Sequence, residues 1–131
     1  MLRKINPPSI MAPVNHAYAH ATLVPAGAEV LHISGQIGGD ANGNVPADPG
    51  QQAENAWSNV MAIIREAGMN ANDIVKLTAY VVDEAAFAPY AAARNRDIGT
   101  TDRVAATAVF VPRLLQKEWK IEIEAIAARS A

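Results

Sequence analysis

Two carboxylates near the end of the chain, Glu122 and Glu124, alternate with Ile121 and Ile123. A period of two is typical of a β-strand with one apolar face, and it places both carboxylates on the other face. A covered sheet face holds two carboxylates only where cations or donors pair with them, or where they perform chemistry. The spacing therefore indicates either a strand that positions a proton or a water molecule, or a set of structural ion pairs.

The histidines and the hydroxyl groups give no comparable signal. His16 and His20 lie four residues apart, as on one helical face, but Pro13 and the residues around it predict a loop and a strand. The chain contains no cysteine, which excludes a thiol nucleophile, a disulfide and a zinc–thiolate site. No serine–histidine–aspartate signature is present either. We therefore predict no metal site and no cofactor.

Composition limits the class of protein. With 131 residues, of which 50% are hydrophobic and 18% charged, the chain suits one globular α+β domain over residues 1–131. A net charge of −2 and few aromatic residues argue against nucleic-acid binding. No apolar run approaches the roughly 20 residues that span a bilayer. We expect no membrane partner and a cytoplasmic protein, consistent with the missing cysteines.

The residues from 48 to 68 predict the first helix. Asp48 is a suitable N-cap, Pro49 suits the first helical position, and Gln51 completes a capping-box pattern. Apolar residues recur at helical spacing from Ala53 to Ala67 and form one stripe, and Gly68 fits the position after the helix end. A stripe of this width must pack against another element, so this helix is expected to cover a sheet.

The remaining segments predict a mixed sheet and a second helix. Strands are expected at residues 2–5, 18–24, 29–37, 74–82, 105–111 and 119–127, and a helix from near Pro89 to Gly99. Alternation in 29–37 would put Leu31, Ile33 and Ile37 on one face and His32, Ser34 and Gln36 on the other. Two helices then cover one sheet face. Several strands are apolar on both faces, which predicts a homo-oligomer.

Five motifs in this order resemble those of one family. Residues 32–38, HISGQIG, resemble the ISGQ motif of the RidA/YjgF family, also called the L-PSP endoribonuclease-like family. Residues 52–68 resemble its first helix, and residues 73–90 continue the match. The two closing strands, AATAV and IEIEAIA, complete it at residues 105–109 and 121–127. The resemblance extends from about Ile5 to Ala127.

That resemblance implies a fold like the bacterial chorismate mutase and a homotrimer with ligand clefts between subunits. It also implies hydrolysis of reactive 2-imino or enamine acids to 2-keto acids and ammonia. In the family, an arginine on the penultimate strand clamps the substrate carboxylate, and a glutamate on the last strand helps to place water. Glu122 matches that glutamate, so we predict it as the catalytic residue and a carboxylate-bearing metabolite as ligand; a structural carboxylate is the alternative.

The chain departs from the family at the arginine. Counting back without gaps from Ile121, that position falls on Thr107. A neutral hydrogen bond contributes about 0.5–1.5 kcal/mol, against roughly 1.5–3 kcal/mol for one to a charged group. Arg103 lies about 13 Å from Thr107 along an extended strand, and Arg113 lies farther. Only a folded loop or a neighbouring subunit could bring one of them to Thr107.

Other residues are candidates for substrate binding through the same resemblance. Arg94, in the predicted second helix, is a further candidate cation, and Tyr90 or Ala91 stands where the family has an asparagine. Tyr18 matches a tyrosine of the cleft, and its simpler role is a half-buried strand residue. Three neighbouring residues are predicted to line the cleft, or alternatively to end a strand under the first helix: Ser34, Gly35 and Gln36.

Three functions remain open at this point. The first is a hydrolase of an imine, an enamine or a related metabolite. The second, motivated by Thr107, is a trimeric ligand-binding or regulatory protein without catalysis. The third is a ribonuclease, which only the family's alternative name suggests and which the acidic balance disfavours.

Overall fold

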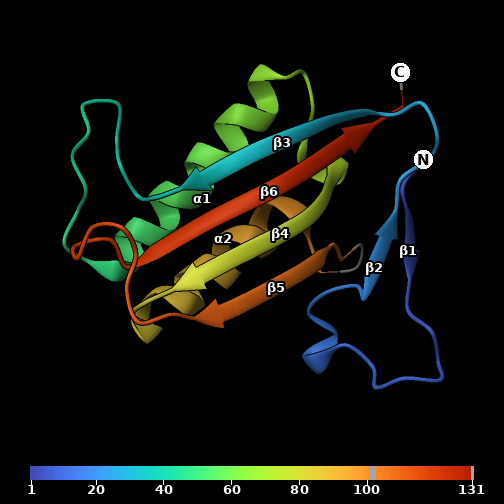
Figure 1. Ribbon diagram of the computed structural model, residues 1–131, viewed down its shortest axis with the longest axis horizontal. Coiled ribbons are helices and arrows are strands. Elements are labelled where there is room, and N and C mark those ends of the chain that lie inside the picture. Colours follow the sequence, from blue (N-terminus) through green and yellow to red (C-terminus); the bar gives the residue numbers. More distant parts are fainter. Residues whose placement is uncertain (101–102, 131) are drawn as a thin grey trace.

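A four-stranded mixed sheet and two helices form the centre of the computed structural model, which describes residues 1–100 and 103–130 (Figure 1). The strand order is β3 (Glu29–Gln36), β6 (Ile121–Arg129), β4 (Ile74–Val81) and β5 (Ala105–Phe110). β6 is antiparallel to both of its neighbours, whereas β4 and β5 are parallel. The predicted α+β class and mixed sheet are confirmed.

Helices α1 (Pro49–Glu66) and α2 (Phe87–Ile98) cover one face of this sheet, as predicted (Figure 1). The Asp48 side chain accepts a hydrogen bond of 2.8 Å from the Gln51 backbone N–H and caps α1. Gly68 follows the last turn with φ +74°, a conformation that glycine adopts without strain. The indole N–H of Trp57 donates to Asp97 Oδ2 at 2.6 Å and ties the two helices together.

The hydrophobic core lies between the sheet and the helices. In β6, Ile121 and Ile123 are fully buried against the helices, and the alternation continues through Ala125 and Ala127. Buried Gln52 of α1 fixes the start of this strand, since its Oε1 accepts from the Lys120 backbone N–H at 2.8 Å. Its Nε2 donates to the Glu118 carbonyl at 2.9 Å. The helix layer thus sets the register of the strand that carries Glu122.

The opposite side of the sheet, which we call the open face, carries the polar residues. Strand register places Glu122 opposite Tyr80, and Glu124 opposite Thr78. Thr78 in turn pairs with Thr107 of β5. In the described part of the chain no helix covers this face, and no helix is long and apolar enough to cross a membrane.

A two-stranded ribbon lies beside the edge strand β5. It consists of β1 (Arg3–Ile5) and β2 (Ala21–Leu23), which are antiparallel, and the chain between them contains a single 3-10 turn at Val14–His16. An isolated bridge between Ala19 and Ala105 attaches this chain to β5. The strand predicted at 18–24 is therefore shorter, and residues 18–20 lie against the edge of the main sheet.

Two predicted details differ from the structure. Helix α2 begins at Phe87 rather than near Pro89, because the Asp83 side chain accepts from the Ala85 N–H at 2.9 Å and starts a 3-10 turn that leads into it. The alternation predicted for 29–37 is broken by a bulge between Ile33 and Gln36. The extra residue pairs Gln36 with Ile123 of the buried side, so Gln36 does not share a face with His32.

Candidate functional site

The carboxylate of Glu122 lies on the open face directly over Gly35 of β3. A Cβ atom built on Gly35 would be 1.8 Å from Glu122 Oε2, so only glycine leaves room for this side chain. Within residues 1–100 and 103–130, the half-buried Glu122 carboxylate has no hydrogen-bond or ion-pair partner. The structure therefore brings two predicted site residues together and leaves the carboxylate available to bind a proton.

Glu124 has a partner, unlike Glu122. Its Oε1 accepts a short hydrogen bond from the hydroxyl group of Tyr80. This hydrogen bond is the main cause of a raised pKa of Tyr80, and desolvation and the charges of Glu124 and Glu122 act in the same direction. The phenol therefore stays neutral and donating, which gives Glu124 a structural partner.

Ser34 and Gln36 flank Gly35 at the end of β3. Ser34 is exposed, and the Gln36 amide donates to the Ser34 carbonyl at 3.0 Å. An open depression of about 580 Å³ includes Gly35, Gln36 and Trp119 in its lining. Of the predicted cleft residues, Gly35 and Gln36 thus line one depression, although the bulge turns Gln36 away from the open face.

A second depression lies at the edge of the sheet, and we call it the β5 depression. Its volume is about 400 Å³, and it combines the predicted site residues Tyr18 and Thr107 with two polar residues that sequence reasoning missed, Lys76 and His20. Lys76 Nζ donates to Thr107 Oγ1 at 2.7 Å. The remaining lining residues are small: Ala19, Ala106 and Ala108.

Within one protomer, the cation beside Thr107 is Lys76. In the described part of the chain, the only ion pairs join Arg96 to Glu54 and Arg129 to Glu29, and Lys76 belongs to neither. Its position could have been inferred from the alternation of Lys76, Thr78 and Tyr80 along β4. What was not visible in the sequence is that β5 pairs with β4 in parallel and brings Thr107 next to this lysine.

Tyr18 and His20 form the wall of the β5 depression on the side of the ribbon. Their rings meet edge to face, with centroids 5.9 Å apart. The Tyr18 phenol oxygen accepts from the Val14 backbone N–H at 3.3 Å, which leaves its own O–H proton free to donate elsewhere. A ring nitrogen of His20 lies 2.6 Å from the Met11 carbonyl oxygen, which holds the imidazole in place.

The structure does not bring the predicted arginines to Thr107 within one protomer. Arg103 Nη1 donates to Asn95 Oδ1 at 2.7 Å and to the Gly99 carbonyl at 3.3 Å, so it joins the end of α2 to the start of β5. Arg113 bonds to carbonyls of its own loop. Arg103 does line a separate depression of about 470 Å³, which shares Tyr18 with the β5 depression.

Tyr90 and Arg94 lie in the helix layer, on the other side of the sheet from the open face. Tyr90 is 1% exposed and packs edge to face on Trp57. The Arg94 guanidinium lies 5.4 Å from the centre of the Tyr90 ring, a cation–π distance. Burial raises the pKa of Tyr90, and Arg94 opposes that shift. Both side chains have structural roles in one protomer.

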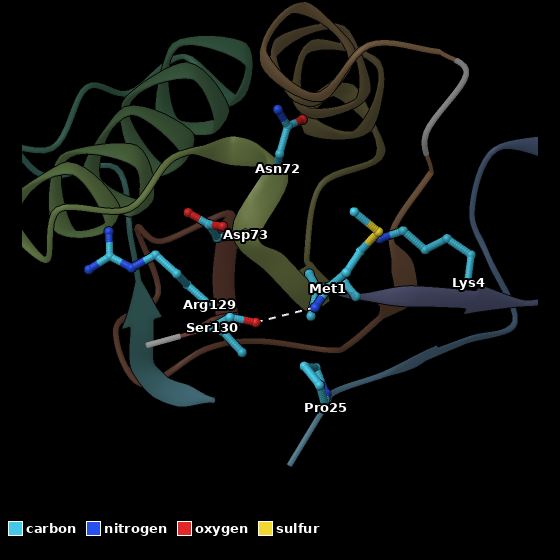
Figure 2. Close-up of a pocket in the computed structure, with 9 residues that line it drawn as sticks. Met1, Lys4, Pro25, Asn72, Asp73, Arg129 and Ser130 are labelled. Atoms are coloured by element: carbon cyan, nitrogen blue, oxygen red, sulfur yellow. Dashed lines mark hydrogen bonds between the residues drawn. The ribbon is translucent and has the colours of Figure 1, made fainter. Parts of the chain in front are cut away.

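Within the described ranges, no three His, Cys, Asp or Glu side chains gather closely enough to hold a metal ion. A depression of about 450 Å³ lies where the two chain ends meet, and the Met1 amino group donates to Ser130 Oγ there at 3.2 Å (Figure 2). None of the predicted site residues lines it.

Known proteins match nearly the whole chain. The model of the family described as endoribonuclease L-PSP matches residues 9–129. The 2-iminobutanoate/2-iminopropanoate deaminase of Escherichia coli is 42% identical over 103 residues, which cover 76% of this chain and 80% of the relative. The crystal structure of the Rid-family protein YyfB from Yersinia pestis superposes with a TM-score of 0.84 at 31% identity and covers 98% of both chains. The crystal structure of E. coli TdcF with bound serine gives a TM-score of 0.68 at 33% identity, covering 92% of this chain and 91% of TdcF.

Proposed function

The chain belongs to the endoribonuclease L-PSP family, also known as RidA/YjgF, and from this premise we propose that it hydrolyses reactive 2-imino or enamine acids. The products are the corresponding 2-keto acid and ammonia. The name of the 42% identical relative, a 2-iminobutanoate/2-iminopropanoate deaminase, supports this class of substrate. We further propose that the protein works in the cytoplasm, where amino-acid metabolism produces such intermediates.

The observation that carries the proposal is the carboxylate of Glu122, which has no partner among the described residues and lies over Gly35. A half-buried carboxylate with free lone pairs accepts a proton from a water molecule and directs the water oxygen at a bound carbon. The water oxygen bonds to the imine carbon while the C=N π electrons move to the nitrogen, which takes the proton that Glu122 removed from the water. The C–N bond then breaks as the new hydroxyl group loses its proton and becomes the keto group, and the nitrogen leaves as ammonia. The step adds one water and transfers only protons, so it needs no oxidant.

We propose that the complete site forms between subunits of a homotrimer. Glu122 and Thr107 lie on strands that β4 separates and are offset by two residues along the sheet, so they are roughly 12 Å apart at a strand spacing of about 4.8 Å and a rise of about 3.3 Å per residue. A small imino acid does not bridge that distance within one protomer. Val109 is 42% and Phe110 65% exposed at the edge of β5, which supports a contact with another subunit there.

The test compares the two carboxylates of the same strand. An amino-acid oxidase generates 2-iminobutanoate in situ, and release of the keto acid is followed above the spontaneous rate. Wild-type protein should accelerate release, and Glu122→Gln should lower kcat about 10²–10⁴-fold, the usual contribution of a positioned acid–base group. Glu124→Gln, whose carboxylate is occupied by Tyr80, should retain most activity.

Two outcomes would overturn the proposal. The first is that wild-type protein gives no acceleration with any of several imines, which would favour a binding or regulatory role on the same scaffold. The second is that the two variants lose activity equally, which would mean that the strand needs its carboxylates for structure and that Glu122 has no specific role.

A further inference from the structure

We propose that Lys76, positioned by Thr107, binds the carboxylate of the substrate in the β5 depression. The inference rests on the proposed hydrolysis and adds to it the residue that recognises the acid group. Lys76 Nζ uses one of its three N–H donors on Thr107 Oγ1 at 2.7 Å. Its other two donors have no acceptor among the described residues and are free for an anion.

The charge of Lys76 has no counter-ion among residues 1–100 and 103–130. The side chain is half-buried, so its ammonium is screened less than one in bulk water. Register places Ile126 of β6 and Ala105 of β5 beside Lys76. Thr107, two residues farther along β5, accepts its hydrogen bond. Glu124, the nearest acid by register, pairs instead with Tyr80. A partly desolvated cation in a depression without a carboxylate is a binding position for an anionic ligand.

The rest of the depression suits a small carboxylic acid. Tyr18 accepts from Val14 through its oxygen and keeps its O–H proton, so it supplies a second donor toward the same space. Ala106 and Ala108 give the wall small apolar side chains that fit a short alkyl chain. The volume of about 400 Å³ lies within the range of small-molecule sites. Together these features favour short-chain 2-imino acids over acids with large side chains.

Lysine and arginine bind a carboxylate differently. Arginine holds it with a planar fork, whereas the lysine ammonium is a point charge on a flexible stem. Thr107 compensates in part, because its hydrogen bond restricts where the ammonium points. We therefore expect charge recognition with a tolerance for the exact orientation of the ligand, and we expect Lys76→Arg to keep carboxylate binding within a few-fold.

Binding of a stable product analogue tests the assignment directly. Calorimetry measures the Kd of wild-type protein for 2-oxobutanoate and for its neutral amide. The wild type should bind the acid at least tenfold more tightly than the amide, and added salt should weaken only the acid. Lys76→Met should weaken the acid about 10–100-fold and leave the amide within twofold. The matched control Lys120→Met removes a lysine side chain that donates to the Lys117 carbonyl and lines neither depression, so it should change neither Kd.

The results that would overturn the inference do not depend on one variant folding. If wild-type protein binds acid and amide equally, the depression does not recognise the charge. If folded Lys76→Met binds the acid as tightly as the wild type, another cation performs this role. Glu122→Gln separates this inference from the proposed hydrolysis, because it should lose turnover but keep the wild-type Kd for 2-oxobutanoate.

Discussion

The two ends of the open sheet face differ in charge and in how their charges are satisfied. At the β3–β6 end, two carboxylates project from one strand, and only Glu124 has a partner. At the β5 end, Lys76 lies beside a neutral threonine with no carboxylate in contact among the described residues. Each end therefore retains one charge that the described residues do not neutralise.

This difference assigns two tasks, proton transfer and recognition of the substrate carboxylate, to two groups that do not neutralise each other. A free carboxylate close to a cation would pair with it and lose its ability to take a proton. Glu122 and Lys76 lie on the neighbouring strands β6 and β4, but Lys76 pairs with Ile126, four residues along β6 from Glu122, so about 13 Å separates them along the strands. Each therefore stays available, and a ligand bound between subunits meets both. We call the β3–β6 end, which carries Glu122, the acidic end, and the β5 end, where Lys76 contacts Thr107, the basic end. We infer that the acidic end acts on water and that the basic end holds the substrate.

The largest effect is expected when both ends are removed. The double variant Glu122→Gln/Lys76→Met should lose about 10³–10⁶-fold in kcat/KM, the product of the two single losses, because groups far apart act independently. Single-turnover release of keto acid measures this. A double variant no worse than Glu122→Gln alone would show that Lys76 does not serve the same reaction.

The variant Gly35→Ala is expected to displace the Glu122 carboxylate without removing a charge. The added methyl would lie 1.8 Å from Glu122 Oε2, so the carboxylate must move. A shift of about 1 Å at a catalytic group costs on the order of 10²-fold, and we expect a 10–100-fold loss in kcat with binding of 2-oxobutanoate unchanged.

A nearby glycine offers the control for that variant. The added methyl of Gly39→Ala meets the tip of Ile37 at 3.3 Å and Val45 at an ordinary contact distance of 3.8 Å, so this variant should keep wild-type kcat. Equal losses in both glycine variants would place the cause in the backbone of the loop, and the position of Glu122 would then not explain the result.

The variant Thr107→Val tests whether Thr107 positions Lys76. It keeps the shape of the side chain and removes the oxygen that accepts from Lys76. Affinity for 2-oxobutanoate should fall about 2–10-fold, the equivalent of one neutral hydrogen bond, while kcat stays the same. An unchanged Kd would mean that Lys76 needs no positioning by Thr107.

The smallest effect is expected on stability, when the hydrogen bond between Tyr80 and Glu124 is removed. The folded protein raises the pKa of Tyr80, so the neutral phenol stabilises the fold below pH 10 and that contribution is lost as pH rises through the higher folded pKa. Urea unfolding at pH 8 should show Tyr80→Phe slightly less stable than wild type, and the gap should narrow above pH 10. A gap that grows with pH would contradict this sign.

The acidic end could be predicted from the sequence because its signal is local. Strict alternation in β6 placed Glu122 and Glu124 on one face, and the resemblance to the ISGQ motif predicted Gly35 as a residue of the cleft. The bulge that turns Gln36 away from the open face could not be predicted from the sequence, because one inserted residue changes the strand pairing without changing the composition.

The basic end could not be predicted, because its residues come from three separate segments. Lys76, Thr107 and Tyr18 meet only through the parallel pairing of β4 with β5 and the bridge at Ala19. The cleft roles of Tyr90 and Arg94 stay predictions. Within one protomer Tyr90 packs against Trp57 and Arg94 lies over the Tyr90 ring, contacts that helical spacing alone did not reveal.

The division of tasks between the two ends is tested most directly by steady-state kinetics of Glu122→Gln and Lys76→Met on 2-iminobutanoate. We predict that Glu122→Gln lowers kcat and leaves KM near the wild-type value, whereas Lys76→Met raises KM about 10–100-fold with a smaller change in kcat. If both variants lower kcat with KM unchanged, or both raise KM alone, the two ends do not perform separate tasks.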